Sequence, residues 1–311
     1  MGKINENDRQ YNYILLAEKF YLDNKKEKAG EFYKKALKFQ SSLENQIAIL
    51  YNVAQIYDEI GKPLESLKNY EKILELDSDQ AGSHYGMAIM YERIGEYEEA
   101  MDHYHNAIHL DPSYDRAYYY AANLYDKMGN QEKALEYYYK VIELAPDDHV
   151  AYNNIGSIYE EKNQDSKAYE MFLQSLYIEP GYHKALFNMG VVHKKLGDYD
   201  KALECYFKAI ESNPEFATAY LNISEIYIEE ERFQDTIDLL SEGIKNNPDK
   251  EDLYYNRACC YSKLGKNSKS IKDLRKAIIL LPSIINYIKV DDDFKNLHQD
   301  IEFIDLIGQF K

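Results

Sequence analysis

Six of the seven prolines in this sequence recur every 34 residues, which marks the chain as an array of repeated units. They are Pro112, Pro146, Pro180, Pro214, Pro248 and Pro282. Regular spacing of a rare residue is typical of repeat proteins, in which each unit packs only against its neighbours. The length of 311 residues alone would suggest about two domains. The periodicity replaces that expectation with a single array.

A second series has the same 34-residue spacing and consists mostly of glycine: Gly61, Gly95, Gly129, Asn163, Gly197, Glu231 and Gly265. Apolar residues at helical spacing lie on both sides of each member. Glycine or asparagine after a helix is typical of a left-handed C-cap, and proline after the next helix stops it. Each repeat is therefore predicted to be a helical hairpin.

The two series define a repeat frame, with the glycine series at position 15 and the proline series at position 32. The predicted repeats are 10–43, 47–80, 81–114, 115–148, 149–182, 183–216, 217–250 and 251–284. Positions 8 and 20 hold small residues throughout, such as Gly190 and Ala202, whereas positions 11 and 24 mostly hold large rings, such as Tyr206. We expect the small residues to allow close helix contact while the rings pack beside them.

This pattern resembles the tetratricopeptide repeat, with its helix–turn–helix unit, small positions 8 and 20, aromatic positions 11 and 24 and proline at 32. The resemblance covers residues 10–284 and departs locally at Ser41, Ser78, His84 and Gly243. It implies an all-α fold, a right-handed superhelix of the α-solenoid type. Residues 1–9 form a polar segment ahead of the array.

The tail, residues 285–311, lies outside the repeat pattern and is predicted to be a C-terminal capping helix. Phe294, Leu297, Ile301 and Ile304 are spaced to form one apolar helical face that would cover the last repeat. The aspartates 291–293 would lie at a helix N-terminus, where negative charge is favourable. Their spacing does not match a calcium-binding loop.

Charge and composition narrow the classes of partner and compartment. The net charge is −17, so the chain lacks the basic footprint that nucleic acid or an anionic membrane would need. The cysteines Cys205, Cys259 and Cys260 suit a reducing compartment. No apolar run is long enough to span a membrane and no secretory signal is evident, which predicts a cytoplasmic protein.

The sequence contains no recognisable catalytic motif, so we expect no enzyme activity, no cofactor and no metal. Asp102, His105 and His109 share one helical face, but they fall on the outer side of a second helix, as an ordinary polar face would. Cys259 and Cys260 are adjacent and point to different faces, which argues against a shared site.

In the tetratricopeptide family, positions 2, 5, 9 and 12 of the first helix, with 6 and 13 beside them, line a groove that holds peptides or partner chains. Position 6 here is asparagine in five repeats: Asn52, Asn154, Asn188, Asn222 and Asn256. Such a ladder could bind the amides of an extended backbone. The alternative is that these side chains are simply hydrated.

Chaperone-adaptor members of this family grip a peptide carboxylate with a five-residue clamp. Asn123, Asn154 and Lys184 match three of its positions, whereas Tyr119 and Asn188 stand where cations are expected. This argues for a backbone-binding patch with few cations. The predicted peptide-binding groove consists of Arg116, Tyr119, Asn123, Asn153, Asn154, Lys184, Asn188 and Asn222.

The sequence therefore predicts a protein–protein interaction scaffold that binds an extended peptide or partner segment. Repeats 81–114 and 217–250 each carry a net charge of −5, so these acidic flanks would prefer basic segments, whereas the balanced repeat 183–216 would tolerate a carboxylate. A peptide-sensing regulator that acts through a separate effector is the alternative, followed by a part of a glycosyltransferase-like assembly. Self-association through exposed tyrosines is compatible with each of these.

Overall fold

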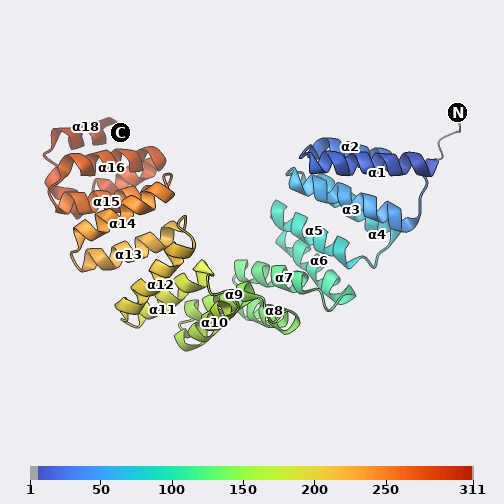
Figure 1. Ribbon diagram of the computed structural model, residues 1–311, viewed down its shortest axis with the longest axis horizontal. Helices are drawn as coiled ribbons and strands as arrows, with labels where there is room; N and C mark the ends of the chain where they lie inside the picture. The colour runs from blue at the N-terminus through green and yellow to red at the C-terminus, as the bar shows by residue number, and fades with distance from the viewer. Residues whose placement is uncertain (1–5, 310–311) are drawn as a thin grey trace. The chain divides into compact units, whose positions relative to one another are not determined.

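The computed structural model describes residues 6–309, and the side chains of residues 8–309 (Figure 1). Within that range the chain is helical and contains no strand, which confirms the all-α prediction. The chain divides into two compact units, the first ending at Asp147 and the second beginning at Asp148. Of the polar segment 1–9, residues 1–5 lie outside the described part, and the first helix begins at Glu6.

Unit 1 consists of four consecutive helical hairpins. Each odd-numbered helix packs against the even-numbered helix that follows it, and α2, α4 and α6 pack against the next hairpin. The helices are α1 (Glu6–Leu22), α2 (Lys26–Ala36), α3 (Leu43–Glu59), α4 (Pro63–Leu76), α5 (Ala81–Ile94), α6 (Tyr97–Leu110), α7 (Asp115–Lys127) and α8 (Gln131–Leu144).

Unit 2 continues in the same way with four hairpins and then a tail of short helical pieces. The helices are α9 (His149–Glu161), α10 (Asp165–Ile178), α11 (His183–Lys195), α12 (Tyr199–Ser212), α13 (Ala217–Glu229), α14 (Phe233–Asn246), α15 (Glu251–Lys263), α16 (Asn267–Leu280), η1 (Pro282–Ile284), α17 (Ile285–Ile288), η2 (Asp292–Leu297) and α18 (Ile301–Gln309).

The turn inside each hairpin has the left-handed residue that the sequence predicts. All seven members of the glycine series have positive φ, from 55° at Asn163 to 89° at Gly95, and even Glu231 adopts 57°. The amide that follows closes the cap, as where the Lys62 N–H donates to the Tyr57 carbonyl at 2.8 Å. The second helices from α6 to α16 end two residues before their prolines. Both local signals are confirmed.

The contact between the two helices of a hairpin depends on the small residue at position 8. In α11 this residue is Gly190, and the Tyr206 ring of α12 lies directly on it; Gly156 and Phe172 repeat the arrangement one hairpin earlier. The other hairpins have alanine or, in α13, serine at this position. The predicted pairing of small residues with large rings is thus confirmed in the core.

Gly190→Ala is expected to destabilise the α11–α12 hairpin by about 1–3 kcal/mol, because a new Cβ would lie 2.5 Å from the Tyr206 ring. The matched control is Gly30→Ala in α2. There a Cβ meets nothing closer than Ile56 at 3.5 Å, so the helix should gain up to about 1 kcal/mol. Amide hydrogen exchange of the two hairpins measures both effects. Unchanged protection of α11 and α12 in Gly190→Ala would contradict the packing argument.

The tail differs from the expected single helix with one apolar face. Phe294 and Leu297 are fully buried, as predicted, but Ile301 is 82% exposed and Ile304 is also exposed, while Phe303 and Leu306 enter the core. The break between η2 and α18 changes the helical phase, so the residues that face inward shift by two positions.

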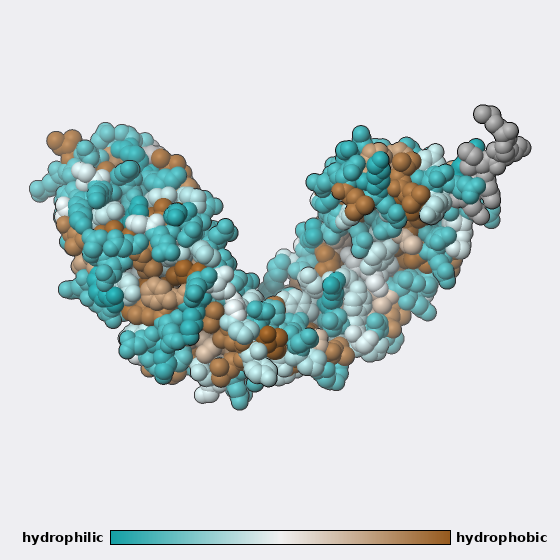
Figure 2. Space-filling model, viewed as in Figure 1, coloured by the Kyte–Doolittle hydropathy of each residue, from teal (hydrophilic) through white to brown (hydrophobic). Residues whose placement is uncertain are grey.

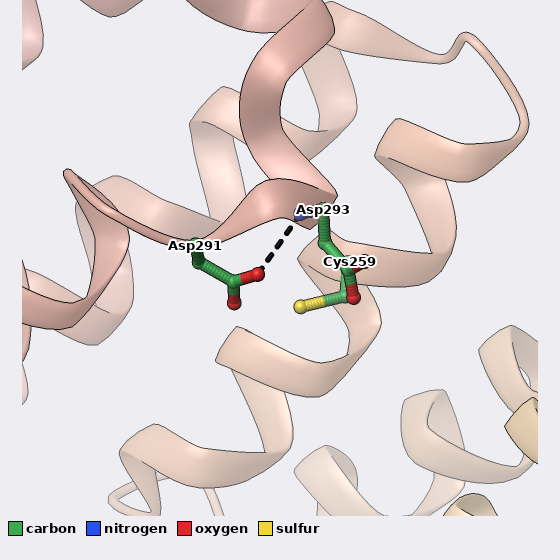
Figure 3. Close-up of side chains that lie close together, drawn as sticks. All are labelled: Cys259, Asp291 and Asp293. Carbon is green, nitrogen blue, oxygen red and sulfur yellow. Dashed lines mark hydrogen bonds between the residues drawn. The ribbon is translucent and has the colours of Figure 1, made fainter.

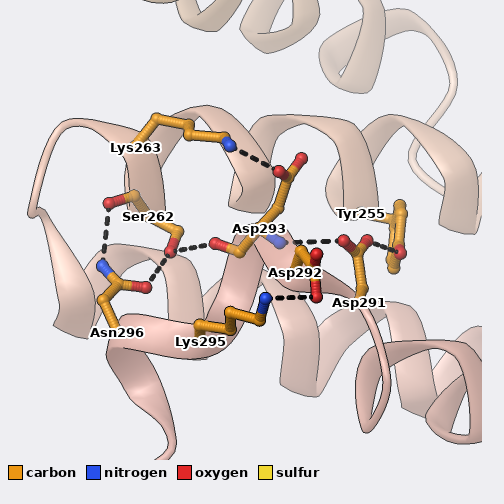
Figure 4. A network of polar contacts seen from close by, with 8 residues as sticks. All are labelled: Tyr255, Ser262, Lys263, Asp291, Asp292, Asp293, Lys295 and Asn296. Carbon is orange, nitrogen blue, oxygen red and sulfur yellow. Dashed lines mark hydrogen bonds and ion pairs between the residues drawn. The ribbon is translucent and has the colours of Figure 1, made fainter.

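A polar network fastens η2 to α15, as Figure 4 shows. The Ser262 hydroxyl lies 2.6 Å from both the Asp293 carbonyl oxygen and Asn296 Oδ1, and Asn296 Nδ2 donates to the Ser262 carbonyl at 3.0 Å. Lys263 Nζ pairs with Asp293 at 2.6 Å. The Asp291 carboxylate caps the N-terminus of η2 by accepting from the Asp293 N–H at 2.9 Å, which agrees with the predicted role of these aspartates.

On the face shown in Figure 2, both units are mostly hydrophilic with scattered apolar patches. Within residues 6–309, no helix combines the length and the apolar character needed to cross a bilayer.

Candidate functional site

The predicted groove residues lie on the first helices of their hairpins, but in different units. Unit 1 holds Arg116, Tyr119 and Asn123 on α7. Unit 2 holds the remainder: Asn153 and Asn154 on α9, Lys184 and Asn188 on α11, and Asn222 on α13. We call the surface formed by positions 2, 5, 6, 9, 12 and 13 of the first helices the first-helix face.

In unit 2 the asparagines bond to one another across neighbouring hairpins. Asn188 Nδ2 donates to Asn153 Oδ1 at 3.0 Å and lies 3.2 Å from Ser157 Oγ. Asn153 is only 4% exposed, and its own amide lies 3.4 Å from Asn154 Oδ1. The Asn188 amide, which donates to the Asn153 oxygen, thus holds α11 to α9. This connection between helices is a role that the sequence did not suggest.

Lys184 and Asn222 lie further along the first-helix face of unit 2. Lys184 is exposed at the start of α11, and Asn222 is half-buried. Asn222 Nδ2 donates to the Thr218 carbonyl of its own helix at 3.0 Å, while its Oδ1 is not needed for that bond. These two residues therefore remain compatible with the predicted contact to a backbone.

In unit 1 the predicted residues adjoin a cluster of tyrosines. The Tyr119 ring lies edge-on to Tyr120 and Tyr138, with centroids 5.4 and 6.0 Å apart, and the Tyr138 hydroxyl donates to Asn123 Oδ1. Arg116 is exposed at the start of α7. It is close enough to the cluster to partly offset the effect of burial on the pKa of Tyr51, Tyr85 and Tyr114.

The same face of unit 1 contains a cavity of about 770 Å³ that the sequence reasoning missed. We call it the tyrosine pocket. Its aromatic walls are Tyr51, Tyr70, Tyr85, Tyr97 and Tyr120, its apolar part includes Gly86, Ile89 and Met90, and its polar edge includes Gln55, Asp58, Glu92, Arg93 and Lys127. The sequence features that correspond to this pocket are at positions 5 and 6 of the repeats. Position 5 is tyrosine in three successive repeats, and the asparagine series at position 6 is replaced by Gly86 and Tyr120.

Burial keeps the hydroxyls of Tyr70 and Tyr85 in the pocket protonated. Burial raises the pKa of Tyr70 and Tyr85 well above the usual value, and it raises the pKa of nearby Tyr114 to about 12. The rings pair edge to face, Tyr51 with Tyr70 at 5.5 Å and Tyr85 with Tyr120 at 5.8 Å. The pocket therefore presents fixed ring faces and protonated hydroxyls to whatever enters it.

The polar edge of the pocket is a row of ion pairs between successive hairpins. Asp58 Oδ1 lies 2.9 Å from Arg93 Nη1, and Glu92 Oε1 lies 4.0 Å from Lys127 Nζ. The Tyr104 hydroxyl donates to Glu92 Oε2 at 3.1 Å. Each carboxylate stands at position 12 and each cation at position 13 of the next repeat, so the row follows directly from the repeat spacing.

The residues considered for metal binding in repeat 81–114 do not assemble into a cluster among the described side chains. His105 Nε2 instead lies 3.1 Å from the Tyr125 hydroxyl, and burial lowers the pKa of His105. Asp102 and His109 are exposed.

One group of three metal-type ligands exists in the described part of the chain: Cys259, Asp291 and Asp293, whose ligand atoms lie within 4.8 Å of one another (Figure 3). Both oxygens of Asp291 already accept hydrogen bonds, one from the Asp293 N–H and one from the Tyr255 hydroxyl. Asp293 pairs with Lys263. Burial raises the pKa of the Cys259 thiol far above its usual value. These contacts explain why the three side chains lie close together: they belong to the network that attaches η2 to α15.

Sequence profiles of the tetratricopeptide repeat match residues 47–80, 115–148, 149–182, 183–216 and 251–280, and a further profile of this repeat matches residues 90–129. Together these matches cover more than half of the chain. The chain belongs to the tetratricopeptide repeat family. The first-helix face described above is therefore a surface of tetratricopeptide repeats, and the two predicted signatures of each hairpin, the cap and the proline, are those of the family.

Several solved structures resemble this chain in fold. The MamA protein is 29% identical, with a TM-score of 0.50 over 57% of this chain and 96% of that chain. The pilF protein of Pseudomonas aeruginosa is 15% identical, with a TM-score of 0.57 over 71% of this chain and 97% of that chain. Cut9–Hcn1 from the APC/C is 15% identical, with a TM-score of 0.56 over 96% of this chain and 55% of that chain. No curated protein matches the chain.

Proposed function

We propose that this tetratricopeptide repeat protein is an interaction scaffold that binds an extended segment of a partner protein on its first-helix face. The observation that supports this most directly is the tyrosine pocket. A cavity of about 770 Å³ with tyrosine walls and a few polar groups has the size and composition of a recognition pocket. Tyrosine and arginine are the residue types that most often dominate binding energy at interfaces.

The division of the chain into eight repeats from 10 to 284, with a cap at 285–311, belongs to this proposal. So do the groove residues of unit 2. Asn154, Lys184 and Asn222 would contact the backbone of a bound segment, while Asn153 and Asn188 would keep α9 and α11 in position. In unit 1, Arg116, Tyr119 and Asn123 would extend the contact from the tyrosine pocket along α7.

The test uses peptides selected from a random 12-residue library on the full chain. Tyr85→Ala is expected to weaken their binding at least tenfold, because it removes one wall of the tyrosine pocket. The matched control is Tyr177→Ala, which removes an exposed ring from α10 and should leave affinity unchanged. Titration by calorimetry gives both values. A library that yields no binder, or binders that tolerate Tyr85→Ala, would contradict the proposal.

A further inference from the structure

The tyrosine pocket exists because the asparagine series at position 6 is interrupted in unit 1. Residue 86 of α5 is glycine, and the Tyr70 ring of α4 occupies the space directly above it, so that any Cβ at this position would overlap the ring. Tyr70 is almost fully buried, yet it lines the pocket. The Tyr70 ring thus forms the floor of the tyrosine pocket, at the place where hairpins with asparagine at position 6 present a side-chain amide.

The walls present aromatic faces rather than an unbroken aliphatic surface. The Tyr51 ring stands at 78° to Tyr70 and the Tyr85 ring at 65° to Tyr120. In an edge-to-face pair, one ring leaves part of its negatively polarised face uncovered. Faces of this kind attract ammonium and guanidinium groups.

The two carboxylates of the pocket are incompletely compensated. Asp58 Oδ1 is buried, and no donor among the described residues reaches it with hydrogen-bond geometry, although Arg93 Nη1 lies 2.9 Å away. Burial raises the pKa of Asp58, and the opposing effect of Arg93 is smaller. Glu92 Oε2 accepts a hydrogen bond from the Tyr104 hydroxyl, but its ammonium partner, Lys127, lies only at the 4.0 Å limit of an ion pair with Oε1. A further cation in the pocket would therefore stabilise both groups.

The two cations at the edge of the tyrosine pocket, Arg93 and Lys127, are largely exposed to solvent. The side chains of Arg93 and Lys127 are 52% and 50% exposed, and Lys127 also lies over the Tyr97 ring, 4.6 Å from its centroid. Exposed pairs of long side chains contribute little stability. They can swing outward at low cost when another cation takes their place.

The net charge of the residues around the pocket also favours a cationic ligand. Residues 47–114, the two predicted repeats that surround the pocket, contain four basic and thirteen acidic residues, a net charge of −9. Most of these acids lie on the second helices and loops, outside the pocket, where they create a long-range negative potential. Such a potential draws a cationic segment toward the surface before contact is made.

We propose that the tyrosine pocket receives a lysine or arginine side chain of the bound partner, which makes this protein a receptor for basic segments. The inference rests on the proposed function, since it names the chemistry that the first-helix face recognises. The aliphatic stem of the ligand residue lies against Ile89, and its charged head is held between the tyrosine faces and the carboxylates of Asp58 and Glu92.

The first experiment examines the peptides selected on the full chain. Peptides that lose affinity in Tyr85→Ala are expected to share one lysine or arginine. Replacing that residue by norleucine, which keeps the stem and removes the charge, should weaken binding about tenfold in 50 mM salt. The difference should shrink in 500 mM salt because the long-range part of the attraction is screened.

The second experiment tests the pocket from the protein side. Asp58→Asn/Glu92→Gln keeps the shapes of both side chains and should also weaken the basic peptide about tenfold, while binding of the norleucine peptide stays unchanged. The matched control is Glu65→Gln/Glu75→Gln, which removes the same charge from exposed positions on α4. It should produce less than a twofold change.

The outcomes separate this inference from the proposed function. If selected peptides depend on Tyr85 but carry an acidic, aromatic or aliphatic residue at the sensitive position, the basic ligand is excluded and the scaffold function stands. The same holds if norleucine binds as well as lysine or arginine. If no selected peptide depends on Tyr85, the proposed function itself fails.

Discussion

Phe294→Ala is expected to lower the free energy of unfolding of the C-terminal end of unit 2 by about 3–5 kcal/mol. Phe294 has no exposed surface and lies in one core with Leu297, Phe303 and Leu306. Its ring also meets Tyr255 of α15 edge to face, with centroids 5.6 Å apart. Truncation leaves a cavity between η2 and α15 that the short pieces of the tail can close only by moving the polar network of Figure 4.

Hydrogen exchange followed by mass spectrometry locates the loss. Protection of α15, α16 and the tail should fall together in Phe294→Ala, whereas unit 1 should keep its wild-type exchange because each repeat depends only on its neighbours. Val290→Ala is the control, since this side chain is exposed in the same tail. Wild-type protection of α15 in Phe294→Ala would show that the tail does not stabilise the last hairpin.

Asp273→Ala is expected to cost a comparable 3–5 kcal/mol, roughly, at the α15–α16 hairpin, because it leaves the Arg257 guanidinium largely buried without its counter-ion. The pair is bidentate: Arg257 Nε donates to Asp273 Oδ2 at 2.7 Å and Nη2 donates to Oδ1 at 2.8 Å. Nη1 donates to Ser241 Oγ of α14 at 2.9 Å. The two charged side chains are only 16% and 7% exposed, so water cannot replace the lost carboxylate.

The double variant Arg257→Met/Asp273→Leu supplies the decisive comparison. It removes both charges and keeps apolar bulk, so its stability should lie within about 1.5 kcal/mol of the wild type. Urea denaturation monitored by exchange of α15 and α16 gives the three values. A double variant as unstable as Asp273→Ala would mean that the side chains act through their shape and not through an uncompensated charge.

The turns and helix ends of this protein could be predicted from sequence because they depend on local backbone geometry. Gly95 and even Glu231 occupy left-handed positions that the 34-residue spacing marks, and the helices end ahead of their prolines for a reason contained in a few consecutive residues. The contact of Gly190 with Tyr206 is only slightly less local, since both belong to one hairpin.

The tail was harder to predict because a short break changes which residues face inward. The spacing of Phe294, Leu297, Ile301 and Ile304 fits one continuous helix, but the helical structure is interrupted between η2 and α18. The interruption lets the Ser262 network fasten η2, and it turns Phe303 and Leu306 into the core instead. A periodic pattern cannot reveal such a break when both phases contain apolar residues.

In the candidate site, too, some features follow from local sequence and others from packing between repeats. The repeat spacing alone determined that a face of first helices exists and which positions line it, because those positions follow from helical periodicity. Tertiary packing decided which side chains and hollows the face presents. The Asn188 side-chain amide donates to Asn153 Oδ1 of the neighbouring hairpin, and the Tyr70 ring lies over Gly86 from the preceding hairpin and forms part of the tyrosine pocket. Contacts between side chains of different repeats depend on rotamers and on the neighbour's residue type, and these appear only when the helices are packed.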